Sequence, residues 1–394
     1  MRAPAFLIQN APFLAAGALL TFMSSFGQTF FISGFGAEIR GSFGLSHGAW
    51  GGIYTLGTAA SAIVMVWAGS LTDIYRVRLL GPAVLVALAA ACLAMALNPF
   101  VALLPVVIFA LRLFGQGMSS QLALVAMARW FAASRGKALS IATLGFAVGE
   151  AILPVTFVAL MVVVDWHLLW IVAAAICLAG VPVIGRLLAQ ERTPQTLAQT
   201  DSSTGMGGRQ WSRRDVLRDP LLWVMVPAIL GPPAFNTAFF FHQAHFAEIK
   251  DWRHVELVAF FPLYTGSAVA AMLLTGWALD RVGATRLMVY AQLPMVAAFV
   301  IFAVAAGPAA MLTGLFFLAL TTGANATLPN AFWAEVYGTA HIGAIKAMVA
   351  AVMVLGSAIG PGVTGLLIDL GFGLETQFLG IAVYFVGATL LMWV

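Results

Sequence analysis

Two ionisable side chains lie deep inside long apolar segments of the chain, and they are the first candidates for chemistry. Arg112 lies in the middle of segment 102–128, and Glu150 is the only acidic residue well inside such a segment, 138–163. A charge at membrane depth is costly, so it normally faces a cavity or a partner. We therefore expect Arg112 to bind substrate or to act with Glu150 in proton coupling, since desolvation and a nearby cation set the pKa of such a carboxyl. The alternatives are a static ion pair and a structural arginine that binds backbone carbonyls.

The composition places these two residues in a membrane protein. Hydrophobic residues make up 62% of the 394 residues and charged residues only 9%, and the mean hydropathy is +0.98. Segments of about 18 or more apolar residues are typical of membrane-spanning helices. The net charge of +4 does not indicate nucleic acid as a partner. Cys92 and Cys177 both lie in apolar segments, which argues against a disulfide framework or a metal site.

Twelve apolar segments can be drawn along the chain, and a polar stretch divides them into two sets of six. The stretch 189–219 is rich in Ser, Thr, Gln, Gly and Arg and is expected to be a cytoplasmic linker between halves 1–188 and 220–394. The predicted spans are about 12–35, 47–69, 79–97, 102–128, 138–163, 168–187, 221–246, 255–279, 287–306, 309–332, 343–368 and 377–394. The sequence predicts an all-α membrane protein.

The basic residues predict the orientation in the membrane. With the N-terminus in the cytoplasm, 15 of the 19 Lys and Arg residues fall on the cytoplasmic side, three lie outside, and Arg112 is within the membrane. An excess of basic residues on one side is the signal that orients membrane proteins. We expect both termini in the cytoplasm and the chain in the cell (inner) membrane.

Two short charged loops repeat at nearly the same place in each half. Residues 276–286 read Gly-Trp-Ala-Leu-Asp-Arg-Val-Gly-Ala-Thr-Arg, and residues 69–78 read Gly-Ser-Leu-Thr-Asp-Ile-Tyr-Arg-Val-Arg. The later loop closely resembles the signature Gly-x-x-x-Asp-(Arg/Lys)-x-Gly of the major facilitator superfamily of transporters; the earlier one departs from it at Ile74 and Arg76. The resemblance implies a gate on the cytoplasmic side, because an aspartate is attracted to a helix N-terminus. The implied gating residues are Asp73, Arg76, Arg78, Asp280 and Arg281.

Further correspondences between the halves extend the resemblance to the whole chain. Tyr54 matches Tyr264 at an offset of 210, and the pair Gly145/Gly149 matches Gly356/Gly360 at an offset of 211. We interpret the glycine pairs as surfaces where helices pack closely. Duplicated six-helix units are a common architecture of secondary transporters. The resemblance implies two pseudo-symmetric six-helix bundles and alternating access to a central cavity.

The resemblance also indicates the residues that line this cavity, which belong to the first, fourth, seventh and tenth helices. In the fourth helix, Arg112-Leu113-Phe114-Gly115-Gln116-Gly117 is similar to the family's pattern Arg-x-x-x-Gly-x-Gly, one residue shorter. Helix-to-helix hydrogen bonding is the alternative for each uncharged polar residue. The candidate substrate-binding residues are Gln28, Arg112, Gln116, Asn236, His242, Tyr264 and Asn325.

The seventh apolar segment contains two adjacent prolines and two histidines. Pro232 and Pro233 lack the amide hydrogens that would bond carbonyls one turn earlier, and we expect this break to line a cavity. The run Phe239–Gln243 resembles the seventh helix of the monocarboxylate and oxalate–formate branch of the family. His242 is the stronger candidate, and His245 lies three residues further toward the outer end.

The favoured function is proton-coupled uptake of a small organic anion such as a monocarboxylate, because Arg112 can offer two parallel hydrogen bonds to a carboxylate. The alternatives are a proton-coupled exporter of amphipathic drugs or metabolites, and uptake of a neutral or zwitterionic metabolite. The sequence contains no nucleotide-binding Gly-x-x-x-x-Gly-Lys-(Ser/Thr) motif and no visible catalytic cluster. We expect no enzyme activity, no cofactor and no metal, with protons, the substrate and the bilayer as partners of a monomer.

Overall fold

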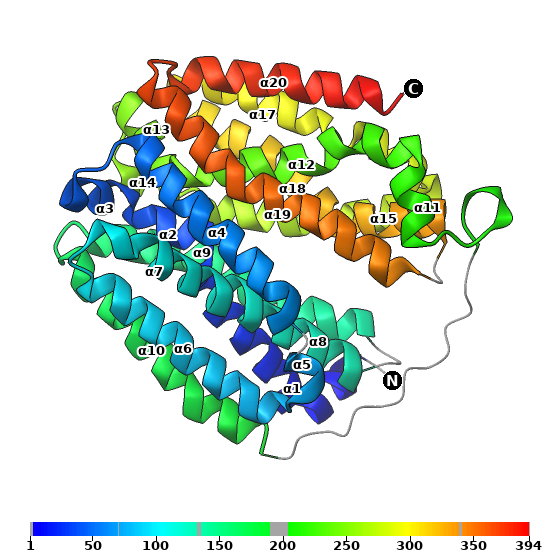
Figure 1. Ribbon diagram of the computed structural model, residues 1–394, viewed down its shortest axis with the longest axis horizontal. Helices are drawn as coiled ribbons and strands as arrows, with labels where there is room; N and C mark the ends of the chain where they lie inside the picture. Colours follow the sequence, from blue (N-terminus) through cyan, green and yellow to red (C-terminus); the bar gives the residue numbers. More distant parts are fainter. Residues whose placement is uncertain (1–2, 70, 132–134, 190–203, 339–340, 394) are drawn as a thin grey trace. The chain divides into compact units, whose positions relative to one another are not determined.

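The computed structural model describes residues 3–69, 71–131, 135–189, 204–338 and 341–393, and every regular element in these ranges is a helix (Figure 1). Twelve helical stretches in these ranges are long and apolar enough to cross a membrane. Helices are expected there because the hydrocarbon core offers no water to bond a free amide or carbonyl. The predicted all-α fold with twelve membrane-spanning helices is confirmed.

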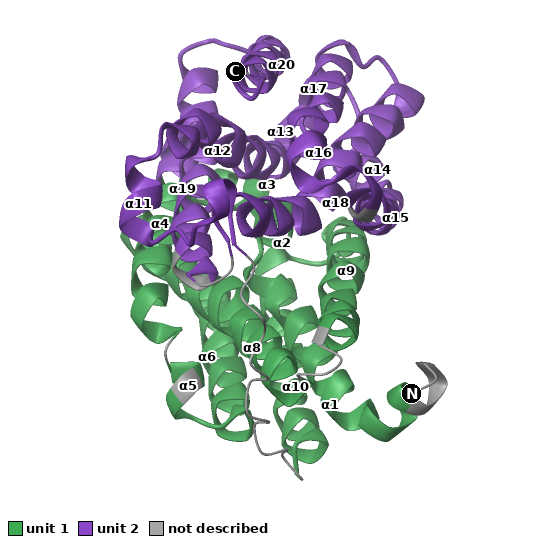
Figure 2. Ribbon diagram, turned by 90° about the vertical axis from the view of Figure 1, so that its right-hand side faces the viewer, with its two compact units in different colours: residues 1–45, 53–200 green, residues 46–52, 201–394 purple. Residues whose placement is uncertain are grey.

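The chain divides into two compact units by its internal contacts (Figure 2). Unit 1 contains Met1–Leu45 and Ile53–Thr200, and unit 2 contains Ser46–Gly52 and Asp201–Val394. Helix α4 (His47–Ala68) therefore begins in unit 2 and continues in unit 1. The other described elements of unit 1 are α1 (Ala3–Ser24), η1 (Ser25–Gly27), α2 (Thr29–Ile32), η2 (Ser33–Phe35), α3 (Gly36–Phe43), α5 (Leu71–Ile74), α6 (Val77–Leu97), η3 (Val101–Leu103), α7 (Leu104–Leu111), η4 (Arg112–Ser119), α8 (Ser120–Trp130), α9 (Arg135–Leu160) and α10 (Trp166–Leu187).

Unit 2 repeats the helix pairing of unit 1. In unit 1, α1 packs against α9 and α6 packs against α10. In unit 2, the equivalent pairs are α12 with α19 and α17 with α20. The described elements of unit 2 are η6 (Met206–Gly208), α11 (Arg213–Arg218), α12 (Pro220–Phe241), α13 (Gln243–Ile249), α14 (His254–Val258), α15 (Phe261–Val282), α16 (Ala284–Tyr290), α17 (Leu293–Val304), α18 (Pro308–Tyr337), α19 (Ile342–Asp369) and α20 (Leu374–Leu391).

Glycines bring the backbones of the paired helices into contact. A Cβ on Gly145 of α9 would lie 1.9 Å from the carbonyl oxygen of Ala18, and one on Gly360 of α19 would lie 2.2 Å from that of Ala234. No side chain fits at these positions without moving a backbone, which is how small residues let membrane helices pack closely. The close-packing role predicted for the glycine pairs in α9 and α19 is confirmed.

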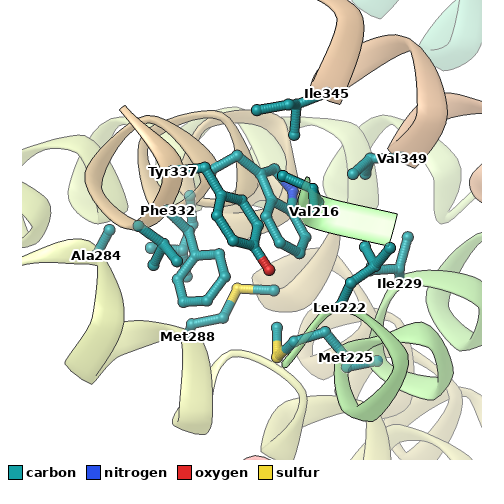
Figure 3. Close-up of a cluster of buried hydrophobic side chains, with 14 of the residues drawn as sticks. Val216, Leu222, Met225, Ile229, Ala284, Met288, Phe332, Tyr337, Ile345 and Val349 are labelled. Carbon is teal, nitrogen blue, oxygen red and sulfur yellow. The ribbon is translucent and has the colours of Figure 1, made fainter. Parts of the chain in front are cut away.

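A buried apolar cluster in unit 2 joins five of its helices. Val216 of α11 lies among side chains of α12, α16, α18 and α19, with Met288 and Tyr337 near its centre (Figure 3). The amide of Trp211 donates to the carbonyl of Tyr337, and the two rings are in contact. The end of the stretch expected to be a linker is therefore packed onto unit 2.

The adjacent prolines of the seventh span do not interrupt α12, which is helical from Pro220 to Phe241. Pro232 leaves the carbonyl of Ala228 without its usual helical donor. The side-chain amide of Gln292, which is 1% exposed, donates to that carbonyl instead. A neighbouring side chain therefore satisfies the Ala228 carbonyl, and the expectation that this part of the helix lines a cavity stays a prediction.

Candidate functional site

Arg112 stands where the helix of the fourth span changes its winding. Helix α7 ends at Leu111, and the following segment η4 (Arg112–Ser119) is a π-helix that leads into α8. In a π-helix the backbone hydrogen bonds span five residues instead of four, so the winding changes and the side chains point in other directions, and such segments are frequent at functional sites. The side chain of Arg112 is only 3% exposed.

The first membrane helix is broken opposite Arg112, which corrects the expectation of one continuous span over 12–35. Helix α1 ends at Ser24, a short 3-10 turn follows, and Gln28 has an extended backbone with φ −86° and ψ 155°. The amide of Phe31, which a continuous helix would direct to Gly27, donates to the carbonyl of Gln28. The carbonyl of Gly27 is thereby released from the helical ladder.

The guanidinium of Arg112 fills the gap left by this break. Its Nη1 donates to the carbonyl oxygen of Gly27 at 3.2 Å and to the hydroxyl of Thr29 at 3.3 Å. The two helices approach closely at this point, because a Cβ on Gly27 would lie 2.1 Å from the carbonyl oxygen of Leu111 and 2.7 Å from the Cα of Gly115. The Gly27 carbonyl is thus a backbone partner of Arg112, of the kind expected for a structural arginine.

A tyrosine completes this arrangement, which we call the Arg112 network (Gly27, Thr29, Tyr54 and Arg112). The ring centroid of Tyr54 lies 5.4 Å from the guanidinium carbon, within the range of a cation–π contact. The hydroxyl of Tyr54 is hydrogen-bonded to that of Thr29 at 2.5 Å. The Nε of Arg112 is buried and donates to no acceptor among the described residues. The network therefore anchors one edge of the guanidinium and leaves the Nε edge available.

Glu150 is not among the described acceptors of Arg112. It is half-buried on α9, and the acceptors of Arg112 among the described residues are Gly27 and Thr29. Gln28 is 9% exposed at the break itself, and Gln116 is half-buried within η4. The structure thus brings Gln28 and Gln116 to the two elements that hold Arg112, and it does not form the buried ion pair between Arg112 and Glu150.

In unit 2 the predicted site residues lie on several helices. Tyr264 of α15 is 1% exposed and donates to the hydroxyl of Thr322 at 3.1 Å. Asn236 of α12 and Asn325 of α18 are half-buried, and the side-chain oxygen of Asn236 has no hydrogen-bond partner among the described residues. His242, at the C-terminal end of α12, is 4% exposed.

The predicted gating residues are only partly described. The side chains of Asp73 and Asp280 lie outside the described residues. Arg76 precedes α6 and is exposed, and Arg78 donates to the carbonyl of Ala189 at 3.1 Å. The guanidinium carbon of Arg281 lies 3.8 Å from the ring centroid of Trp277.

Two charged residues at the ends of the fourth and tenth spans act on these loops and escaped the sequence analysis. Nη1 of Arg129 donates to the carbonyl of Thr72 at 2.7 Å. The carboxylate of Glu335 accepts from the amide of Ala284 at 2.9 Å and from the hydroxyl of Thr285 at 3.0 Å. Glu335 therefore caps α16, and its position three residues after the tenth apolar segment (309–332) was the available signal.

Comparison with known proteins decides the family. The description of the Major Facilitator Superfamily matches residues 17–308, about three quarters of the chain. The chain belongs to the Major Facilitator Superfamily. It is therefore a multi-pass membrane protein of a transporter family, and the recognition made from the two signature loops is confirmed at that level.

Solved structures of superfamily members share the fold. A bacterial homologue of the human lysosomal transporter Spinster, inward-facing and unoccupied, is 14% identical with a TM-score of 0.72, and the match covers 98% of this chain and 96% of that one. A mutant of the nucleoside transporter NupG is 12% identical with a TM-score of 0.73, covering 97% and 99%. At such identities the likeness concerns the fold alone. The comparison with curated proteins gives no match.

Proposed function

We propose that this superfamily member is a secondary active transporter that works by alternating access and takes up a small organic anion, such as a monocarboxylate, together with protons. The observation that supports the anion is the state of Arg112. This cation is 3% exposed, and the described residues offer it a carbonyl, a hydroxyl and an aromatic ring but no carboxylate. A substrate carboxylate would supply the missing negative charge.

The geometry of the Arg112 network supports a particular mode of binding. Nη1 is engaged by Gly27 and Thr29, which fixes the plane of the guanidinium. The Nε edge then presents two parallel N–H groups, Nε–H and one of Nη2, to a carboxylate. Gln28 and Gln116 are the neighbouring amides proposed to contact the rest of the substrate. For unit 2 we propose Asn236, Tyr264, His242 and Asn325 as binding residues.

Proton coupling is assigned to Glu150 in this proposal, acting with the charge of Arg112. A half-buried carboxyl on a membrane helix can exchange a proton as its exposure changes during transport. Replacement by glutamine keeps the shape and removes the titration. We expect Glu150→Gln to retain substrate binding and to lose the dependence of transport on a pH gradient; unchanged pH dependence would contradict this role.

The test of the anion site uses purified protein and small carboxylates. We expect lactate and formate to raise the melting temperature of the wild type, and the corresponding amides to leave it unchanged. Arg112→Lys keeps the charge but cannot offer two parallel N–H groups, so it should bind carboxylates more weakly by about 10- to 100-fold, the range expected for a lost charged hydrogen bond. Arg186→Lys, at an exposed position of α10 in the same unit, is the matched control.

The same screen separates the alternative function, export of amphipathic compounds. The half-buried carboxylate of Glu150 favours this alternative, because it could receive a lipophilic cation. Stabilisation by lipophilic cations that is lost in Glu150→Gln and kept in Arg112→Lys would support the exporter and refute anion uptake. We further propose halves 1–188 and 220–394, a monomer in the inner membrane, and both termini in the cytoplasm.

A further inference from the structure

Three of the six histidines of the chain lie close together within unit 2. His47 is the first residue of α4, His242 ends α12, and His245 lies in α13. The ring centroids of His47 and His245 are 4.1 Å apart, and those of His47 and His242 are 5.9 Å apart. The described residues hold no group of three or more His, Cys, Asp or Glu side chains that could bind a metal ion. We call these three residues the histidine cluster.

The neighbours of the histidine cluster distinguish its members. Nε2 of His242 lies 3.1 Å from the carbonyl oxygen of Pro361 in α19; a carbonyl only accepts, so Nε2 carries a hydrogen. The ring of His242 is buried. Nδ1 of His245 lies 3.4 Å from the carboxylate of Glu248, whose side chain is 73% exposed. A carboxylate thus lies beside the ring of His245, and a backbone carbonyl lies beside the ring of His242.

A second carboxylate fixes His47 in place. The carboxylate of Asp369, at the end of α19, accepts from the hydroxyl of Ser46 at 2.6 Å, from the amide of His47 at 3.1 Å and from the amide of Gly48 at 2.8 Å. The fit is tight, because a Cβ on Gly48 would lie 2.5 Å from this carboxylate, and one on Gly365 would lie 2.4 Å from the carbonyl oxygen of His47. Asp369 thus caps the N-terminus of α4 from another helix.

We propose that His47 and His245 form a proton-binding site that is complete only while Asp369 caps α4. One imidazolium lying against a neutral imidazole ring is favourable, whereas two imidazolium rings at that distance repel each other. Asp369 of α19 and Glu248 of α13 are the negative charges that favour the first proton. The site therefore takes one proton, shared by the His47–His245 pair.

The consequence is a coupling between pH and the start of α4. In the proposed site the Asp369 carboxylate lies beside His47 while it caps α4, so the capped arrangement would bind the proton more tightly than an uncapped one. By linkage, the bound proton stabilises the cap. The stabilisation is present at low pH, where the pair is protonated, and is lost as the pH rises through the range in which histidine titrates. This deepens the proton coupling proposed above and does not depend on the substrate.

Hydrogen exchange of the full-length protein in detergent tests the site. Exchange of the amides of residues 46–52, corrected for the intrinsic rate at each pH, reports how often the cap opens. In the wild type we expect protection to be greater at pH 6 than at pH 8, by up to about tenfold. His47→Gln and His245→Gln should each abolish this pH dependence. His167→Gln should retain the pH dependence, because His167 lies in α10 and is hydrogen-bonded to Asp165, outside the histidine cluster.

A variant of the cap itself keeps the test falsifiable. Asp369→Asn removes the charge and one acceptor oxygen, so protection of residues 46–52 should fall by roughly tenfold or more at both pH values. Protection that is lower at pH 6 than at pH 8, or pH dependence that survives in both histidine variants, would overturn the proposal. These measurements need no substrate, so failure of carboxylate binding in the thermal screen would leave their outcome unaffected and would be recognised separately.

Discussion

Replacing Gly27 by alanine should destabilise unit 1 more than any other single added methyl group around the Arg112 network. The new Cβ would lie 2.1 Å from the carbonyl oxygen of Leu111, 2.7 Å from the Cα of Gly115 and 3.0 Å from the amide nitrogen of Gln116, whereas ordinary contact begins at 3.4 Å. All three atoms are backbone, so no side chain can move aside to make room.

The size of the effect follows from two contributions. Overpacking in a tight core typically costs about 1–3 kcal/mol, and backbone neighbours place this case at about 3 kcal/mol. Separating the helices also weakens the bond from Arg112 to the Gly27 carbonyl, a bond to a charged group of a kind that contributes about 1.5–3 kcal/mol. We expect a total loss of about 4–5 kcal/mol in the free energy of unfolding.

Equilibrium unfolding in mixed micelles of a mild detergent and SDS, followed by tryptophan fluorescence, measures this loss. Gly41→Ala is the matched control, because Gly41 lies within α3 and an added Cβ there meets nothing within 4 Å. That substitution should stabilise the helix by roughly 0.5–1 kcal/mol. A free energy of unfolding for Gly27→Ala within 1 kcal/mol of that for Gly41→Ala would refute the reading of a backbone-to-backbone contact at the break.

Three further substitutions test other contacts. Gln292→Leu leaves the Ala228 carbonyl buried without a donor. It should lower the free energy of unfolding by about 1–3 kcal/mol in the same assay. The control Gln9→Leu, on the exposed face of α1, should have little effect. Glu335→Ala removes the cap of α16 and should cost about 0.5–2 kcal/mol; a change below 0.3 kcal/mol would count against the cap. The hydrogen bonds from Ser212 lower the pKa of Asp215, so its carboxylate supports α11 above the ordinary aspartate pKa and loses this effect as the pH falls through the lowered value. Protection of the α11 amides, corrected for the intrinsic exchange rate at each pH, should therefore fall in acid, and Ser212→Ala should show the lower protection already at pH 7.

The membrane-spanning helices could be predicted from the sequence because hydropathy and length decide them. The breaks within the helices could not, because they depend on neighbouring helices. The first helix breaks at Gln28, where no proline marks the position. The backbone around Leu111 and Gly115 packs directly against Gly27, and Arg112 donates a hydrogen bond to the released Gly27 carbonyl. In the seventh span two prolines marked a break, yet the helix continues because Gln292 supplies the missing donor.

The candidate site was predictable to the same extent. Arg112 is recognisable from the sequence because an arginine inside an apolar segment must have a structural or functional reason. Its partner Thr29 was not recognisable, since a threonine in a membrane helix is ordinary and only the broken backbone turns its hydroxyl toward the guanidinium. Likewise Glu248 and Asp369 belong to different helices from His47, and only the fold brings them to one place.

The break in the first helix has a consequence for the order in which the protein is made. Gly27 of the first span is synthesised more than 80 residues before Arg112, the residue that donates a hydrogen bond to the released Gly27 carbonyl. In the bilayer an unbonded carbonyl is costly, so we expect the first span to enter the membrane as an uninterrupted helix. We expect it to unwind at Gln28 only after the fourth span has inserted beside it. The break would then be a late product of assembly, and a chain truncated before Arg112 should retain a straight first helix.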